Sequence, residues 1–411
     1  MRPGNGAVKL GKTRLGENYN WTIYACFIAY VIQAIAGNFA PLLFLTFRKT
    51  YGIPIEKISL LITLVFGVQL LVDFLSAVFV NKIGYRTAMI AADCLTAVGF
   101  VLLGVLPLRV DPFAGLVTAS VVFALGSGLM EVLVSPIVEA CPTTRKSAAM
   151  SLLHSFYSWG VAGVILLSTA FFALFGIRNW PVLACLWGVV PAVDLLLFLV
   201  VPIRSVEETG EKAPARRLFR SGKFWIMMLL MLCAGACEQS VSQWASAFAE
   251  AGLGVTKAVG DLAGPCAFAL LMGVSRVFYA KNSERISLLP FMTFSGVLCL
   301  VSYLMASLAT APVVGLLGCA LCGLSVGVLW PGTFSLSAAD LKGGTAMFAL
   351  LALAGDLGCG GGPAYVGMVA GRFGGNLKKG LLAATVFPVL LLAALALCSR
   401  RGKVREKAKK T

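Results

Sequence analysis

The chain has 411 residues, of which 59% are hydrophobic and 13% are charged. Soluble domains are typically about 45–50% apolar and about 25% charged, so this composition excludes a soluble globular protein and indicates an integral membrane protein. The net charge of +16 would suggest nucleic acid as a partner in a soluble protein. Here the basic residues flank apolar segments, where they set orientation and meet anionic lipid headgroups, so no nucleic acid is expected.

Apolar segments of about 20 residues recur along the chain, and each is long enough for a helix to cross a hydrocarbon core of roughly 30 Å. Because membrane β-barrels show short alternating strands instead, the pattern predicts an all-α membrane protein with twelve transmembrane helices. The predicted spans are Trp21–Phe47, Ser59–Val80, Thr87–Leu106, Gly115–Ala140, Ser147–Ile177, Pro181–Ile203, Phe224–Phe248, Ala258–Ala280, Ile286–Ser307, Ala311–Leu336, Thr345–Ala370 and Leu377–Leu397.

The polar segments between the spans show a charge asymmetry. An even number of spans places both termini on one side, and most Lys and Arg residues outside the spans fall on that side. The other side carries only Arg48, Lys49, Lys57, Arg109, Arg178, Lys257, Arg372, Lys378 and Lys379. This asymmetry predicts a multi-pass protein of the cell membrane with both termini cytoplasmic. The first apolar segment has no small-residue cleavage site, so we predict a transmembrane helix there and not a signal peptide.

The longest polar interruption is "RSVEETGEKAPARRLFRSGK", residues 204–223. We interpret it as a cytoplasmic linker. It would join an N-terminal six-helix bundle, residues 1–203, to a C-terminal six-helix bundle with a basic cytoplasmic tail, residues 224–411.

The two predicted bundles resemble one another in sequence. "SPIVEACPTTRKSAAM" in the first corresponds to "WPGTFSLSAADLKGGTAM" in the second, and Pro136 and Pro331 are 331 − 136 = 195 residues apart. Met150 and Met347, which end the two segments, are 347 − 150 = 197 residues apart. This duplication predicts two pseudo-symmetric halves, and transporters built this way hold their site between the halves near the bilayer midplane.

The segment "AVFVNKIGYRTAM", residues 77–89, lies in the predicted short cytoplasmic loop after the second span. It resembles the loop motif of the major facilitator superfamily, Gly-x-x-x-Asp-Arg/Lys-x-Gly-Arg/Lys-Arg/Lys, with Lys82, Gly84 and Arg86 in place. Ala77 replaces the usual glycine and Asn81 the usual aspartate. The resemblance implies the major facilitator fold, with the matching residues forming a lock at the inner end of the spans.

A narrower resemblance comes from "GSGLMEVLVSPIVE", residues 126–139, and "HSFYSWG", residues 154–160. Together they are similar to the fucose permease branch, whose members are proton symporters of monosaccharides. In that branch a fourth-helix glutamate takes part in sugar binding and proton coupling, a role that the resemblance assigns to Glu131. The branch also has an aspartate in its first helix, where "QAIAGNFAP" offers only Gln33 and Asn38, so coupling to protons is left open.

The chemistry of a carboxylate in a bilayer supports a role for Glu131. An ionised acid at the centre of a span costs at least about 2.5–3.5 kcal/mol, so it faces a cavity, meets a partner or carries a proton. A group that alternates between wet and dry surroundings can exchange a proton, as a symporter requires. The alternative is that Glu131 bonds to a neighbouring helix and only stabilises its bundle.

Other polar residues of the spans extend the predicted binding set. His154 is the only histidine, and imidazole titrates in the physiological range; a single structural hydrogen bond is the alternative. Tyr157 lies on the same helix face as His154. Asp356 falls in the glycine-rich "LAGDLGCGGGP", which indicates tight packing or a hinge in the eleventh span, and a functional acid is the other interpretation of Asp356.

The seventh predicted span contributes "CEQSVSQWASAF", residues 237–248. Glu238, Gln239 and Gln243 supply donors and acceptors suited to a neutral polyol. Trp244 lies well inside its span, and we predict that its ring stacks on the apolar face of a sugar. Anchoring at the membrane interface is the alternative use of tryptophan in such proteins.

Further charged residues suggest roles in gating or packing. Asp73 is expected to pair with Arg86 or with the inner gate. Arg276 lies close to the inner end of its span, which indicates gating more than substrate contact. Asp194 is expected to face Arg178 or a neighbouring helix, and the sequence gives it no sharper role.

These observations predict a secondary transporter that moves a small neutral hydrophilic solute, a monosaccharide, by alternating access. An efflux carrier for amphipathic or cationic compounds is the second hypothesis, with Glu131 as the counter-charge, and a membrane receptor that does not transport is the third. No ATP-binding loop is present, and no nucleophile, base and orienting group occur together as in an enzyme. The cysteines are scattered and indicate packing, so we expect no metal or cofactor. We expect a monomer.

Overall fold

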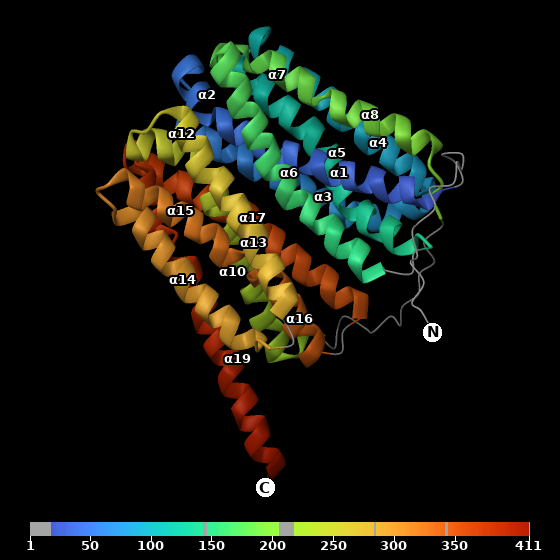
Figure 1. Ribbon diagram of the computed structural model, residues 1–411, viewed down its shortest axis with the longest axis vertical. Coiled ribbons are helices and arrows are strands. Elements are labelled where there is room, and N and C mark those ends of the chain that lie inside the picture. Colours follow the sequence, from blue (N-terminus) through green and yellow to red (C-terminus); the bar gives the residue numbers. More distant parts are fainter. Residues whose placement is uncertain (1–17, 143–145, 205–217, 283–284, 342–343, 411) are drawn as a thin grey trace, which may run out of the picture.

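The computed structural model describes residues 18–142, 146–204, 218–282, 285–341 and 344–410. Nearly all of these residues are helical, and the helices form two groups, one before and one after the predicted linker (Figure 1). We call them the first and the second bundle. Residues 205–217, which make up most of the predicted linker, lie outside the described part, so the proposed domain boundaries remain a prediction.

The first bundle runs from α1 to α8, and several short elements follow one another within one span. Its elements are α1 (Tyr19–Asn38), η2 (Ala40–Leu43), α2 (Phe44–Tyr51), α3 (Ile55–Ile83), α4 (Tyr85–Val105), η3 (Leu106–Leu108), α5 (Pro112–Ala140), α6 (Lys146–Phe175), η4 (Ile177–Asn179), α7 (Trp180–Trp187) and α8 (Val189–Val200).

The second bundle runs from α10 to α19. Its elements are α10 (Gly222–Ser242), α11 (Ala245–Ala247), η5 (Phe248–Gly252), α12 (Lys257–Asp261), η6 (Leu262–Cys266), α13 (Ala267–Asn282), α14 (Leu288–Leu308), α15 (Pro312–Val326), α16 (Leu329–Asp340), α17 (Gly344–Arg372), α18 (Leu377–Ala383) and α19 (Val386–Lys410). Two of them, η5 and η6, are single π-helical turns. Pro265 lies inside η6, where a ring without an N–H disturbs the regular α-helical hydrogen bonds.

The predicted fold class is confirmed. Within the described residues, eleven helices are long and apolar enough to cross a membrane. The 29-residue helix α17 covers the remaining predicted span. The chain enters α1 and leaves α19 at one end of the molecule, which we call the terminal end, and α2 and α12 lie at the opposite, distal end (Figure 1).

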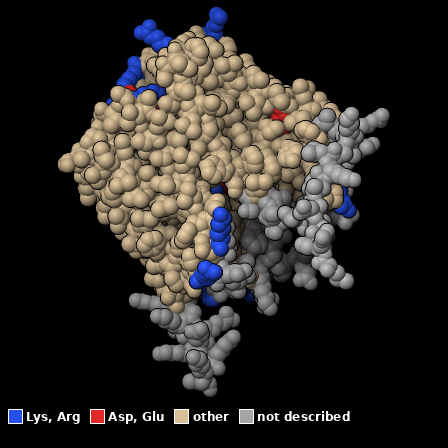
Figure 2. Space-filling model, in the orientation of Figure 1, with Lys and Arg blue, Asp and Glu red and all other residues tan. Residues whose placement is uncertain are grey.

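The outer surface suits a lipid environment. Charged side chains are sparse over the middle of the face shown in Figure 2 and gather toward its ends. Large apolar side chains are exposed on the outside of the helices, with Phe74 at 76% and Leu174 at 77% exposed. Such a surface would be unstable in water, but it costs nothing where hydrocarbon is the solvent.

The loop between α3 and α4 requires a glycine at position 84. Gly84 has a φ of +82°, which side chains with a Cβ atom rarely adopt. Two residues later, the Arg86 guanidinium donates to the carbonyl oxygens of Phe198, Leu199 and Val201 at 2.6, 2.9 and 2.7 Å. Arg86 therefore binds the carboxyl end of α8, where a cation satisfies free carbonyls and the helix dipole.

The helices α10 and α17 pack closely through glycines. A Cβ atom on Gly358 would lie 2.0 Å from the backbone oxygen of Leu232, and one on Gly235 would lie 2.2 Å from the backbone oxygen of Gly355. No larger residue fits at either position unless the helices move apart. The glycine run in "LAGDLGCGGGP" thus brings two helix backbones together, an arrangement common in membranes.

We predict that Gly358→Ala lowers the free energy of unfolding by about 1–3 kcal/mol, because overpacking forces α10 and α17 apart. Thermal unfolding of the purified protein in detergent measures the effect. The matched control is Gly361→Ala on the same helix, since a Cβ atom there meets nothing within 4 Å. Equal stability of the two variants would contradict the packing described here.

Candidate functional site

A cavity of about 950 Å³ lies between the two bundles. Its wall includes residues from α1, α3, α5 and α6 of the first bundle and from α10, α13, α16 and α17 of the second. Eight of the predicted binding residues line it: Gln33, Glu131, His154, Tyr157, Glu238, Gln239, Gln243 and Asp356. Residues far apart in the sequence therefore meet in one chamber.

Glu131 projects into this chamber from α5. Gln69 on α3 donates to its carboxylate, with the Nε2 and Oε2 atoms 3.4 Å apart, and the Gln33 side chain of α1 also forms a hydrogen bond with it. Glu131 has no ion pair with another described residue. An acid held only by two amides can be stable with or without its proton, because an amide can donate to one form and accept from the other.

Two further acids meet across the seam between the bundles. The side chains of Asp73 on α3 and Asp356 on α17 interact with one another, and two carboxyl groups can share a hydrogen bond only when one of them carries a proton. The Oδ1 atom of Asp73 is buried without a hydrogen-bond partner among the described residues. Glu131 interacts electrostatically with both, so three acids from three helices share one region.

The expected pairing of Asp73 with Arg86 is wrong. The Arg86 guanidinium is fully engaged at the end of α8, as described above, and Asp73 lies against the second bundle instead. Lys82 and Gly84 are exposed at the turn between α3 and α4, and neither lines the cavity. The side chains of Ala77 and Asn81, where the loop motif departs from its pattern, lie outside the described part, so the inner lock remains a prediction.

Arg276 takes a different place from the one its sequence position suggested. It lines the cavity wall and reaches across the seam, where Nη1 donates to Ser158 Oγ on α6 at 3.1 Å. Its Nε donates to the Gly327 carbonyl oxygen at 3.3 Å, and its Nη2 lies 3.7 Å from Glu238 Oε2. Arg276 is therefore a cation within the chamber, loosely paired with one acid and tied to the opposite bundle.

The amides of the second bundle are ordered by their own hydrogen bonds. Gln243 Nε2 donates to Gln239 Oε1 at 3.0 Å and to the Gly37 carbonyl oxygen of the first bundle at 3.1 Å. Because each amide has two donors and an acceptor with two lone pairs, both keep capacity for a ligand in the chamber.

An aromatic side of the chamber belongs to the first bundle. The rings of Tyr30 and His154 lie 5.4 Å apart, and those of Tyr30 and Tyr157 lie 6.4 Å apart. The Tyr30 and Ser135 hydroxyl groups are 3.3 Å apart. Tyr30 was not singled out from the sequence, because a tyrosine inside an apolar first span has no local signal that separates a ligand contact from packing.

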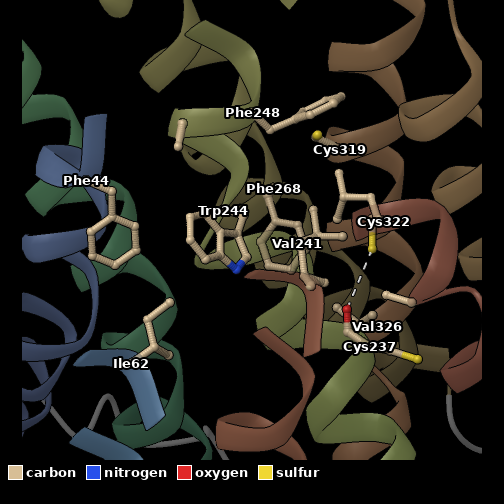
Figure 3. Close-up of a cluster of buried hydrophobic side chains, with 14 of the residues drawn as sticks. Phe44, Ile62, Cys237, Val241, Trp244, Phe248, Phe268, Cys319, Cys322 and Val326 are labelled. Atoms are coloured by element: carbon tan, nitrogen blue, oxygen red, sulfur yellow. Dashed lines mark hydrogen bonds between the residues drawn. The ribbon is translucent and has the colours of Figure 1, made fainter. Parts of the chain in front are cut away.

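Two predicted binding residues, Asn38 and Trp244, do not line the cavity. The prediction that the Trp244 ring stacks on a sugar is therefore wrong. Its ring is 1% exposed and packs against Phe44 of the first bundle, with ring centroids 5.5 Å apart (Figure 3). Its Nε1 atom donates to the Pro363 carbonyl oxygen at 2.9 Å, so its polar atom is already satisfied. Asn38 lies at the end of α1 and donates to Ala34 of its own helix at 2.9 Å.

At the distal end, a largely buried ion pair on α12 contacts the first bundle across the seam. Lys257 Nζ lies 3.0 Å from Asp261 Oδ2 and donates to the Leu42 carbonyl oxygen of the first bundle at 2.5 Å. Asp261 is fully buried and also accepts from Thr169 Oγ1 of α6 at 3.4 Å and from Ser246. Neither Lys257 nor Asp261 was assigned to the site from the sequence. Their pairing within α12 is local, but their contacts with η2 and α6 of the first bundle depend on the tertiary structure.

A second ion pair crosses the seam nearby. Lys49 at the end of α2 lies 2.5 Å from Glu250 of η5. Lys49 is largely exposed, with 68% of its side chain accessible, so solvent weakens this contact. Together with the aromatic contact of Trp244, these contacts hold the distal end of the seam closed, whereas the cavity wall extends to Lys281 near the terminal end of α13.

The cavity also has a large apolar surface. Its apolar lining residues include Ala36, Ala40, Pro41, Phe44, Phe47, Leu61, Ile62, Val65, Phe66, Leu103, Leu116, Phe123, Val277, Val328, Trp330, Pro331 and Phe334. The chamber is therefore amphipathic, with acids and amides on part of the wall and aromatic and aliphatic side chains on the rest.

The sequence comparison agrees with this architecture. Residues 25–363 match the family model of the Major Facilitator Superfamily. The chain belongs to this superfamily. It is therefore a membrane transporter, which makes a receptor without transport the weakest of the three initial hypotheses. Among curated proteins, no sequence matches the chain.

Several solved structures share the transporter's fold at low sequence identity. A bacterial homologue of the human lysosomal transporter Spinster, in an inward-facing and unoccupied conformation, has a TM-score of 0.76 at 15% identity, covering 94% of this chain and 98% of its own. A D-xylose–proton symporter has a TM-score of 0.77 at 11% identity, with coverages of 92% and 96%. The fucose:proton symporter of E. coli has a TM-score of 0.63 at 15% identity, with coverages of 92% and 98%.

We predict that Lys257→Met shifts the transporter toward a conformation open at the distal end, because the charged hydrogen bond to Leu42 contributes about 1–3 kcal/mol to the closed seam. Spin-label amino acids at the exposed positions Thr50 and Ala251 would report the distance across the seam. The control is Lys378→Met, since that lysine bonds to Ala309 within the second bundle. An unchanged distance distribution in Lys257→Met would exclude this contact as a gate.

Proposed function

We propose that this transporter moves a small neutral polyol, most simply a monosaccharide, by alternating access, and that Glu131 exchanges a coupled proton. The observation that carries the proposal is the position of Glu131 in the wall of a chamber between the bundles, held by two amides and unopposed by a described cation. A protonated Glu131 can donate to a hydroxyl group, and the surrounding amides can accept and donate further bonds.

The acids around Glu131 support proton coupling despite the missing first-helix aspartate. The side chains of Asp73 and Asp356 interact with one another, and a hydrogen bond between the two carboxyl groups would require a proton. Charge on Glu131 would act on both of them in a region of low dielectric. The cluster therefore links proton occupancy of the chamber to a contact that joins α3 of the first bundle to α17 of the second.

The contacts across the seam suggest the direction in which the chamber is open. With the termini cytoplasmic, as the basic residues favour, the closed distal end faces outward and the present conformation faces inward. Release of cargo and proton would then occur on the cytoplasmic side. Opening to the outside would require the Lys257 and Lys49 contacts to break.

An efflux carrier for amphipathic cations is the second candidate. The observation that favours it is the extensive apolar lining of the chamber, which exceeds what a monosaccharide needs. A cation would use Glu131 as its counter-charge and bury its apolar part against residues such as Phe66 and Phe123. The two candidates differ in whether the ligand depends on hydrogen bonds from the second bundle.

We predict that Glu131→Gln retains exchange of labelled monosaccharide between the two sides of proteoliposomes but loses accumulation driven by a pH gradient. An amide keeps the polar contacts of the acid but cannot carry the proton. Glu56→Gln, a conservative change at an exposed position at the start of α3, is the control and should behave as the unsubstituted protein. If no monosaccharide exchanges even in the unsubstituted protein, the sugar assignment fails.

We also predict that Gln239→Leu weakens monosaccharide binding by about 1–3 kcal/mol, or roughly 5- to 150-fold, because a ligand hydroxyl loses its partner inside the chamber. Competition of unlabelled monosaccharides in the exchange assay gives the change in affinity. An amphipathic cation should lose little, since it depends on apolar contacts and on Glu131. Undiminished sugar affinity together with strong cation binding would favour efflux.

A further inference from the structure

The first bundle contains a pair of buried acids that the cavity does not reach. Asp93 on α4 and Asp194 on α8 are both 0% exposed. None of their four carboxyl oxygens has a hydrogen-bond partner among the described residues. The two groups interact electrostatically with one another, and neither lines the chamber that holds Glu131. Of the two alternatives expected for Asp194, no ion pair with Arg178 is formed among the described residues, and Asp194 faces the neighbouring helix α4.

The groups around the pair do not neutralise it. Cys26 of α1 interacts with both carboxyl groups and with Cys141, which follows α5. These residues belong to an apolar core formed by α1, α4, α5 and α8. The cation two turns away on α4 is Arg86, and its guanidinium is engaged with the carbonyl oxygens at the end of α8. Within the described part of the chain, no ion pair involves either acid.

Physical chemistry restricts the state of such a pair. Two ionised carboxylates would repel one another and would have lost their hydration without gaining hydrogen bonds, which is among the costliest arrangements in a protein interior. A protonated carboxyl group avoids this cost, and its O–H group can act as a donor, which a carboxylate cannot. An apolar core can hold the pair only if protons neutralise it.

We propose that Asp93 and Asp194 form a proton-binding site inside the first bundle, separate from the acids of the cavity, that holds at least one proton at neutral pH. The proton is taken from water and returned to water. No other group changes its bonds.

The proposed site lies next to the contact between Arg86 and the end of α8. Asp93 lies two turns from Arg86 on α4, and Asp194 lies one turn from Phe198 on α8, whose carbonyl oxygen Arg86 binds at 2.6 Å. Loss of the proton would place like charges between α4 and α8, next to this contact. Thr22 of α1 also donates to the Pro202 carbonyl oxygen beyond α8 at 2.6 Å, so the site lies beside the junction where the first bundle leads into the linker.

Infrared spectroscopy of the purified protein in lipid nanodiscs tests this site directly. We expect the difference spectrum between the unsubstituted protein and the double variant Asp93→Asn, Asp194→Asn to show the carbonyl stretch of a protonated carboxyl group at neutral pH. The matched comparison is Glu131→Gln, whose spectrum should retain that signal. A difference spectrum with carboxylate bands and no protonated-carboxyl band would overturn the proposal.

Two further measurements keep the test decisive. If the double variant does not fold, the single variants Asp93→Asn and Asp194→Asn are compared instead, since each amide can bond to the remaining acid; at least one should lose the protonated-carboxyl band. Sodium chloride and choline chloride should affect the unfolding temperature of the unsubstituted protein equally. A stabilisation specific to sodium that disappears in the Asn variants would show a metal cation in place of the proton. None of these measurements requires transport, so they are independent of the proposed sugar function.

Discussion

The low dielectric of the membrane interior is the constraint that organises this protein. A charged group there must meet water, a partner of opposite charge, free backbone carbonyls or a proton. Arg86 uses carbonyls at the end of α8, and Lys257 uses Asp261 and a carbonyl across the seam. Glu131 lines the chamber, where its carboxyl group can meet water or cargo. The fold can be understood as the arrangement that gives each charge one of these solutions.

The seam between the bundles concentrates the contacts that must change during transport. At its distal end, the Lys49–Glu250 ion pair, the Lys257 hydrogen bond to Leu42 and the tilted ring contact of Trp244 with Phe44 are incompatible with an open passage. Nearer the chamber, Asp73 and Asp356 meet across α3 and α17. Rigid bundles closed by glycine packing can move against one another without unfolding, so a few polar contacts are enough to set the preferred conformation.

The sequence predicts the features that depend on composition and spacing. Span positions follow from hydropathy, and the position of Gly84 follows from a loop motif whose backbone requires a positive φ. Glu131 stands out because a carboxylate is rare and costly at that depth. Each of these signals is local, so a single sequence contains it.

The features that depend on tertiary contacts were missed or misplaced. Tryptophan is a residue type that often stacks on sugar rings, but the ring of Trp244 is buried in the seam. Its Nε1 atom donates to the Pro363 carbonyl oxygen. Arg276 looks like a residue near a helix end, yet its long side chain reaches Ser158 in the other bundle. Asp93 lies inside a predicted span and carries the same signal as Glu131, but its proximity to Asp194 and its lack of a partner are visible only in three dimensions.

The same acids could couple cargo to a proton that moves in the same direction or in the opposite direction. The charge of the cargo decides between the two. A neutral polyol accepts a hydrogen bond from protonated Glu131, so its binding favours proton uptake and the two travel together. A cation stabilises ionised Glu131, so its binding expels the proton and the two travel in opposite directions. Glu131 has no fixed counter-charge among the described residues, so under the proposed function one carboxyl group would couple cargo to protons by competition or by cooperation.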